Sequence, residues 1–258
     1  MSREFVSYLN DGGIVVVTVD RPPVNALNSQ LIKEIIETFE ELESNGNVAV
    51  VILTGAGKAF IAGADIKEIP FLNSEEGQKF SALGQEMTNR IDDFPRPVLC
   101  AIEGLALGGG CEVALACDIR VASENARFGQ PEVNLGVIPG AGGTQRLPRL
   151  VGRGRAKFLL YTGDTIDALE AYRIGLVEKV VSPGNALNEA KKIAKKIMEK
   201  GPVAIALTKK AVNEGMNLSL KEGLEIEKGC FGRACETEDK NEGVRAFLEK
   251  RVPIYKGK

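Results

Sequence analysis

Runs of apolar, β-branched residues alternate with helix-patterned segments throughout the first half of this 258-residue chain. The run GIVVVTVD at residues 13–20 predicts a strand, and VAVVILT at 48–54 predicts a second strand that is buried on both faces. Between them, apolar residues recur at helical spacing from Leu31 to Leu42. The further elements predicted here are a helix over 75–93 and strands over 98–102 and 118–122. Strands that alternate with helices predict an α/β fold with several crossover connections.

The second half of the chain is predicted to be almost entirely helical. The helices expected after Gly142 span residues 143–149, 153–161, 167–173, 185–199, 203–214, 218–233 and 239–250. The clearest break is Gly201-Pro202, which divides a predicted core over residues 1–200 from a helical region over 201–258. Isolated helices of this length are only marginally stable in water. The helical region is therefore expected to pack on the core or on another subunit.

Charge and hydropathy limit the partners that the chain is expected to have. The net charge is only -2, which favours neither nucleic acid nor an anionic membrane. The N-terminus lacks the pattern of a secretory signal, and no apolar stretch approaches the roughly 20 residues that span a bilayer. We therefore expect a cytoplasmic protein without a nucleic-acid or membrane partner.

The chain contains five cysteines and no histidine. An odd number of cysteines without a secretion signal argues against a disulfide framework. Without histidine, Ser-His-Asp and Cys-His catalysis and histidine-ligated zinc are all excluded. Acid/base chemistry would have to come from carboxylates, lysines, tyrosines or backbone groups.

Three successive glycines, Gly108 to Gly110, lie between a predicted strand and a predicted helix that begins with Cys111 and Glu112. Glycines at a helix N-terminus leave backbone N–H groups open, with the positive end of the helix dipole behind them. Such donors can bind a phosphate or the oxyanion that develops on a carbonyl. The phosphate hypothesis is weaker, because neither a Walker A motif nor G-x-G-x-x-G fits. Close packing of helix on strand is the plainer alternative, and Cys111 is expected to be a core residue.

Two further segments offer a second backbone N–H donor and a second carboxyl group. The turn Ala62-Gly63-Ala64 follows a buried run, and the Ala64 N–H could be a second donor there. Glu132 follows Pro131 in an apolar context, so its carboxyl is expected to be desolvated and its pKa raised. The alternative is a capping or ion-paired glutamate, with Arg127 or Arg146 as its partner. Two glutamates, Glu112 and Glu132, beside glycine-rich elements favour an acid/base pair.

Several segments, in the same order along nearly the whole chain, resemble the enoyl-CoA hydratase/isomerase (crotonase) family. They are RPPVNALN (21–28), AGADIKE (62–68), ALGGGCE (106–112), FGQPEVNLGVIPGAGGTQRLPRLVG (128–152), TGD (162–164), GLV (175–177) and TEDKNEGVRAFLEKR (237–251). The resemblance implies a crotonase-type spiral of ββα repeats, with a C-terminal helical region that builds trimers, commonly paired into hexamers. It also implies a coenzyme A thioester as substrate, and no separate cofactor or metal ion.

The resemblance also implies roles for individual residues. The N–H groups of Ala64 and Gly109 correspond to the family's oxyanion hole. The loop that binds coenzyme A corresponds to Ala62, Ala64, Asp65, Ile66 and Lys67, with Val24 and Ala26 in its wall. Many hydratases have a lysine where this chain has Pro23, so one pyrophosphate contact is expected to be missing or to come from another lysine.

The hydratases of this family have one glutamate after GGGC and another in QPE, and both occur here as Glu112 and Glu132. The pair predicts reversible hydration of trans-2-enoyl-CoA to 3-hydroxyacyl-CoA. Glu112 would orient and deprotonate water, and Glu132 would protonate C2. The length of the acyl chain is left open. The residues considered for the acyl pocket are Phe71, Leu72, Ile138 and Phe231.

Three alternatives to hydration remain at this point. One is a Δ3,Δ2-enoyl-CoA isomerase that uses a single glutamate. Another is an RNA-binding homologue, for which the basic stretch from Arg146 to Lys157 would be the contact region, although a solvated helix face explains that stretch more simply. The last is a purely structural trimer, which would leave both glutamates and both glycine turns unexplained.

Overall fold

The protein contains two β-sheets, which a computed structural model describes for residues 3–68 and 71–258. The six-stranded sheet contains, in spatial order, β1 (Val6–Asp11), β2 (Ile14–Val19), β3 (Val50–Gly55), β5 (Val98–Ile102), β7 (Ile119–Ser123) and β10 (Lys179–Val181). The four-stranded sheet contains β4 (Ala59–Ala62), β6 (Leu105–Leu107), β8 (Arg127–Gly129) and β9 (Thr165–Asp167). Neighbouring strands are parallel except for the β1–β2 and β8–β9 pairs.

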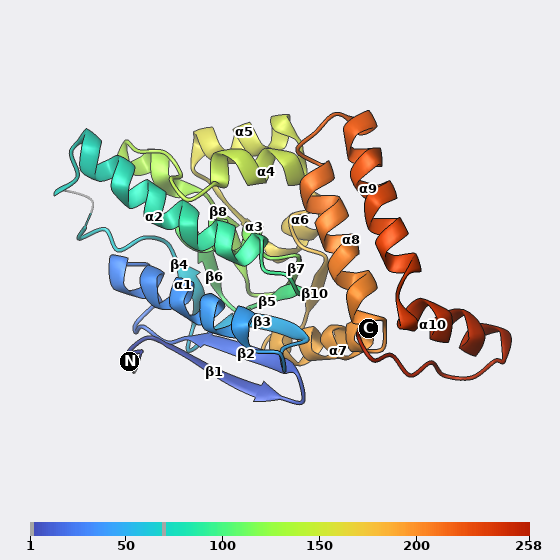
Figure 1. Cartoon of the computed structure of the whole chain (residues 1–258). Coiled ribbons are helices and arrows are strands. Elements are labelled where there is room, and N and C mark those ends of the chain that lie inside the picture. The colour runs from blue at the N-terminus through green and yellow to red at the C-terminus, as the bar shows by residue number, and fades with distance from the viewer. Residues whose placement is uncertain (1–2, 69–70) are drawn as a thin grey trace.

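The chain alternates between the two sheets in a repeating way. Each of the pairs β3–β4, β5–β6 and β7–β8 places its first strand in the large sheet and its second in the small one. After these pairs come, in turn, α2 (Ser74–Asp92), α3 (Gly109–Ala116) and the 3-10 helix η2 (Pro131–Leu135) with α4 (Gly143–Val151). This repeat of two strands and a helix confirms the predicted α/β fold and its spiral of ββα units (Figure 1).

All four strands predicted from the sequence are present, but the six others within the described residues were missed. The missed strands β4, β6, β8, β9 and β10 are only three or four residues long. A segment of that length cannot display a periodic pattern, so nothing in the sequence distinguishes it from a loop. The missed β1 is longer, but it pairs only with β2 and most of its residues are partly or fully exposed.

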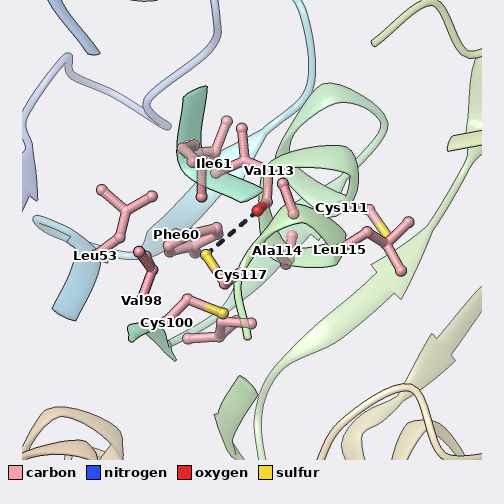
Figure 2. Packing of buried hydrophobic residues seen from close by; sticks show 14 of the residues in the cluster. Leu53, Phe60, Ile61, Val98, Cys100, Cys111, Val113, Ala114, Leu115 and Cys117 are labelled. Carbon is pink, nitrogen blue, oxygen red and sulfur yellow. Dashed lines mark hydrogen bonds between the residues drawn. The ribbon is translucent and has the colours of Figure 1, made fainter. Parts of the chain in front are cut away.

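The larger core cluster lies between the sheets and helices α1 (Ser29–Ser44), α2 and α3, and a second cluster lies between the large sheet and the helix at Ala186–Met198. Every residue of α3 is buried, so this short helix has no solvent face. Its Val113 and Ala114 lie near Phe60 and Ile61 of β4 (Figure 2). Figure 2 also shows Cys100, Cys111 and Cys117 within this cluster, where the Cys117 thiol donates to the carbonyl of Val113. Cys111 is therefore a core residue, as expected, and burial raises the pKa of its thiol to about 12.

The helices predicted after Gly142 are all present in the described part of the chain. They are α4, α5 (Arg153–Thr162), α6 (Ala168–Arg173), α7 (Ala186–Met198), α8 (Pro202–Gly215), α9 (Leu220–Cys235) and α10 (Glu238–Leu248). α8 is joined to the core by an ion pair between Lys209 Nζ and Asp118 Oδ2 at 2.8 Å. α9 lies beside α8, and the chain end returns to the start of α8, where Gly257 approaches Pro202 (Figure 1). The division into regions 1–200 and 201–258 stays a prediction.

Large apolar side chains are exposed on the last three helices and the segments around them. They are Val212, Met216, Leu218, Leu220, Leu224, Phe231, Val244, Phe247, Leu248, Val252 and Ile254. Isolated exposed apolar residues are ordinary, but this region carries more of them for its length than the rest of the described chain does. None of the helices described here is both long enough and apolar enough to cross a membrane.

Candidate active site

Three neighbouring parallel strands of the small sheet end at the same place. Ala62 of β4 pairs in register with Leu107 of β6, which pairs in turn with Gly129 of β8. Each of these three paired residues is the last of its strand. Ala64 follows Ala62 by two residues, Gly109 follows Leu107 by two, and Glu132 follows Gly129 by three. Because the carboxyl ends of parallel strands share one edge of a sheet, the register itself brings these predicted site residues together.

The backbones of Ala64 and Gly109 approach each other closely at this edge. A Cβ built on Gly109 would lie 3.9 Å from the Ala64 nitrogen and 4.0 Å from Glu112 Oε2. Gly109 is the first residue of α3, so its N–H has no partner within the helix. Neither its N–H nor that of Ala64 donates a hydrogen bond to any other described residue. The geometry thus leaves two neighbouring N–H donors without a partner among the described residues. Their role as an oxyanion hole stays a prediction.

Glu112, in the first turn of α3, is a buried carboxylate held by backbone groups. Its Oε1 accepts the N–H of Ala141 at 2.8 Å and that of Gly143 at 2.7 Å. Burial raises the pKa of Glu112, while these two hydrogen bonds and the charge of Arg146 act in the opposite direction. Hydrogen bonds that are donated to a carboxylate favour its ionised form. The arrangement suits a group that is poised to accept a proton.

Glu132, in η2, is partly buried and has a different environment. Burial, followed by the neighbouring Glu112 carboxylate, raises its pKa to about 7. The predicted ion-pair alternative does not apply within the described residues, because Arg146 pairs with Asp92 at 3.3 Å and Arg127 donates to a backbone carbonyl. Two carboxyl groups whose surroundings differ in this way suit opposite roles in proton transfer.

The turn that carries Gly108 makes room for Glu132. A Cβ on Gly108 would lie 2.9 Å from Glu132 Oε1, and the backbone there has φ of 50°, in the left-handed region. Both the space and the conformation therefore favour glycine. Close packing of helix on strand, the plainer alternative for the glycine run, applies at Gly110, where a Cβ would lie 1.9 Å from the carbonyl oxygen of Ile61. The functional interpretation stays a prediction.

Gln130 is a site residue that the sequence analysis missed. It is fully buried. In the amide orientation that gives both its oxygen and its nitrogen a suitable hydrogen-bond partner, the nitrogen donates to Glu132 Oε1 at 3.1 Å and Oε2 at 3.2 Å. A glutamine before Pro-Glu carries no signal of burial by itself, so one sequence could not reveal this contact.

The two glutamates and the two N–H donors line a single cavity of about 960 Å³. Its apolar walls include Leu27, Ile32, Phe80, Met87 and Val137. Of the residues considered for the acyl pocket, Leu72 and Ile138 line this cavity. Phe71 and Phe231 do not line it, and both are exposed. A largely apolar cavity with a few converging polar groups is typical of a site for a small molecule.

The sequence profile of the enoyl-CoA hydratase/isomerase family matches residues 10–258. The chain belongs to this family. It is 52% identical to the short-chain-enoyl-CoA hydratase of Clostridium acetobutylicum over 93% of both chains. It is 48% identical to the crotonyl-CoA hydratase of Syntrophomonas wolfei over 97% of both chains. Its structure is similar to that of an enoyl-CoA hydratase from Bacillus anthracis, with a TM-score of 0.94 and 43% identity over 99% of this chain and 100% of the other.

The residues predicted to bind coenzyme A in this family member lie on two adjoining segments. Ala62 donates its N–H to the carbonyl of Val24 at 3.1 Å, and Arg21 donates to the carbonyl of Ala26 at 2.8 Å. Arg21 also forms an ion pair with Asp65 at 2.7 Å, so Asp65 fixes the loop instead of presenting a free carboxylate. The next two residues, Ile66 and Lys67, are exposed and accessible to a ligand. Contact with coenzyme A stays a prediction for all of them.

The basic stretch from Arg146 to Lys157 is less available to RNA than its composition suggests. Arg146 is directed inward, where it pairs with Asp92 and donates to Thr88 and Asn89. Arg155 lies near the carboxylate of Glu170, at 3.7 Å. The family membership and these ion pairs favour the enzyme over the RNA-binding alternative.

Proposed function

We propose that this protein catalyses the reversible hydration of trans-2-enoyl-CoA to 3-hydroxyacyl-CoA, with Glu112 and Glu132 as its acid/base pair. The observation that carries the proposal is a pair of carboxyl groups beside two open N–H donors in one cavity. Burial raises the pKa of both groups, but Glu112 alone accepts the N–H groups of Ala141 and Gly143, which favour its ionised form. The similarity to the short-chain-enoyl-CoA hydratase of Clostridium acetobutylicum and the crotonyl-CoA hydratase of Syntrophomonas wolfei supports the same activity.

In the proposed mechanism, the thioester oxygen accepts the N–H groups of Ala64 and Gly109. As water adds to C3, negative charge develops on this oxygen, and losing one such donor typically costs about 3–4 kcal/mol of transition-state stabilisation. Ionised Glu112 takes a proton from the water, whose oxygen forms the new bond to C3. Protonated Glu132 gives its proton to C2. The two carboxyl groups exchange a proton through solvent after the product leaves.

The isomerase alternative uses only part of this arrangement. Moving a double bond requires one group that removes a proton and returns it elsewhere, so a second carboxyl would have no role. Glu112 is instead buried and held by two N–H donors, which is a costly arrangement for an idle residue. The hydratase therefore explains more of the site.

The loss of the ultraviolet absorbance of crotonyl-CoA on mixing with the pure protein tests the proposal. We expect the enoyl absorbance to fall with multiple turnovers, and the rate to survive dialysis against EDTA because no metal ion takes part. Hexenoyl-CoA and decenoyl-CoA, compared in the same assay, would give the chain-length preference; the names of the relatives favour the short chain. No absorbance change with any of the three substrates would contradict the hydratase assignment and favour the isomerase.

The pH dependence of kcat/KM should report the ionisation of the pair. Glu132 must hold a proton to protonate C2, and its raised pKa of about 7 keeps that proton in place up to neutral pH. Above that value kcat/KM for crotonyl-CoA hydration is expected to fall, by up to about tenfold per pH unit. A profile that stays flat from pH 7 to pH 9 would contradict the role of Glu132 as the acid. Because the two carboxyl groups interact, the apparent values belong to the pair.

We also propose that the exposed apolar residues of α8, α9 and α10 contact further copies of the chain, in a trimer or a dimer of trimers within the cytoplasm. Their number and clustering support an interface between proteins. Light scattering on the purified protein would measure the mass of the assembly. The mass of a single chain at micromolar concentration would contradict this proposal.

A further inference from the structure

Helix α2 contacts the segment Gly140–Gly143 through one stripe of its surface. The stripe, called here the α2 stripe, consists of Ser81, Gly84, Gln85 and Thr88. Gly84 and Gln85 follow Ser81 by three and four residues, and Thr88 follows them by four and three, so all four share one face of the helix. A Cβ on Gly84 would lie only 3.0 Å from the Cβ of Ala141, so this glycine allows a close approach.

The polar members of the α2 stripe all donate to carbonyls of the facing segment. The Ser81 hydroxyl donates to the Gly140 carbonyl at 2.6 Å, and Gln85 Nε2 donates to the same oxygen at 3.1 Å. Gln85 Nε2 also lies 3.1 Å from Ser81 Oγ and donates to it. The buried Thr88 hydroxyl donates to the carbonyl of Ala141 at 2.8 Å. The segment is thus fixed to α2 at two successive peptide groups.

The first of these peptide groups is the one that reaches Glu112. Its carbonyl belongs to Gly140 and its N–H to Ala141, and this N–H donates to Glu112 Oε1 at 2.8 Å. A peptide group is planar, so a bond that fixes its oxygen also fixes the direction of its N–H. Hydrogen bonds in a chain also polarise and strengthen one another. One peptide group therefore connects the Ser81 hydroxyl with the Glu112 carboxylate.

We propose that Ser81, assisted by Gln85, is a positioning residue that holds the Gly140–Ala141 peptide so that its N–H orients the Glu112 carboxylate toward water. The inference rests on the proposed role of Glu112 as the base. It goes beyond that role because it assigns the orientation of the base to a helix that also forms the wall of the cavity, where Phe80 and Met87 lie. In this proposal, α2 both lines the cavity and fixes the orientation of Glu112.

Several groups besides this peptide face Glu112. Glu132 approaches from η2, and the charge of Arg146 acts from α4. Asp92, at the end of α2, is paired with Arg146. Cys111 is neutral below pH 10, because burial raises the pKa of its thiol to about 12. Ser81 lines the same cavity as Glu112, but removing its hydroxyl changes none of these charges, so the peptide is the direct hydrogen-bonded route by which the titration of Glu112 would shift.

The test compares the wild type with Ser81→Ala and with the double variant Ser81→Ala/Gln85→Ala. We expect kcat for crotonyl-CoA hydration to fall roughly three- to tenfold in the single variant and further in the double variant, with KM changed less than about twofold. A weaker N–H donor favours the protonated form of Glu112, so the acidic limb of the kcat/KM profile should move to higher pH by about half a unit.

Ser44→Ala is the matched control, since it removes a hydroxyl that donates to a helix carbonyl, that of Glu40, on the exposed surface of α1. Its pH profile should superimpose on that of the wild type. An unshifted acidic limb in both α2 variants would overturn the inference, whether or not kcat falls, because simple loosening of the cavity wall lowers kcat without changing the titration. Failure of the proposed function can be distinguished from failure of this inference, because in the first case the wild type itself would hydrate no enoyl-CoA.

Discussion

Replacing Glu132 by glutamine is expected to lower kcat for crotonyl-CoA hydration by about 10²- to 10⁴-fold, the usual contribution of a general acid. Glutamine has nearly the same shape but carries no acidic proton, so C2 would have to be protonated from solvent. The cavity and the two N–H donors stay in place, so binding of the acyl-CoA should be nearly unchanged. Steady-state kinetics, together with the dissociation constant of a saturated acyl-CoA, would separate the two effects.

The same substitution should make the folded protein more stable at neutral to alkaline pH. The folded-state pKa of Glu132, about 7, lies above its usual value of 4.5. The stability of the wild type therefore falls as the pH rises from 4.5 through 7, and Glu132→Gln removes this loss. We expect a gain of about 2 kcal/mol at pH 8 and none below pH 4.5, measured by urea unfolding.

A matched control for this experiment is Glu124→Gln, at an exposed position after β7. It should change neither the rate nor the stability. Loss of activity that accompanies a gain in stability would exclude misfolding of the Glu132 variant as the cause. Near-normal hydration by Glu132→Gln would contradict the assignment of the acid.

The substitution Gly110→Ala is expected to destabilise the protein by roughly 3 kcal/mol or more, because the added methyl group has no space. A Cβ on Gly110 would lie 1.9 Å from the carbonyl oxygen of Ile61 and 2.7 Å from its carbonyl carbon. Both atoms belong to the backbone of β4, which cannot move away as a flexible side chain could. α3 would have to shift from the small sheet, and Gly109 and Glu112 would move with it. The activity should fall with the stability.

Two other glycines provide the comparison. Gly154, in α5, has nothing within 4 Å of its Cβ position, so Gly154→Ala should leave the stability unchanged or raise it by up to about 1 kcal/mol. Gly109→Ala should be intermediate, since its nearest obstacle is the Leu27 side chain, at 2.8 Å. Urea midpoints for the three variants would give this order. A wild-type midpoint for Gly110→Ala would show that the contact between α3 and β4 is looser than it appears here.

Long elements could be predicted from the sequence because their patterns are long enough to be recognised. The strand at 48–54 was expected to be buried on both faces, and β3 (Val50–Gly55) lies between β2 and β5 with nearly every residue buried. The helix expected from Leu31 to Leu42 corresponds to α1, whose apolar face is buried and which Asn28 caps. In both cases the local pattern and the final environment agree, so the sequence alone was sufficient.

The candidate site could be predicted only in part. Glycine runs and acidic residues drew attention to Glu112, Glu132, Ala64 and Gly109, but their convergence depends on the register of three short strands that have no sequence pattern. The donors that hold Glu112 come from residues 29 and 31 positions later in the chain. Arg146 was considered as a partner for Glu132 and proved to pair with Asp92. Such contacts are set by the packing of whole helices, which local sequence does not encode.

The N-cap residue Gly108 and the first two residues of α3, Gly109 and Gly110, differ in what surrounds them, and this affects how the enzyme could be altered. Gly108 leaves space for the Glu132 carboxyl, Gly109 offers its N–H, and Gly110 lets the helix touch β4. Each position resists substitution for a reason of its own. Glu112 also accepts the N–H groups of Ala141 and Gly143, so its exchange would disturb that segment, whereas Glu132 is the side chain that can be varied with less effect on the backbone. An engineer who wants a different reaction on the same thioester should therefore vary Glu132 first and leave the glycines untouched. In the proposed mechanism, the backbone that activates the carbonyl is therefore fixed, whereas the side chain that protonates the substrate is open to design.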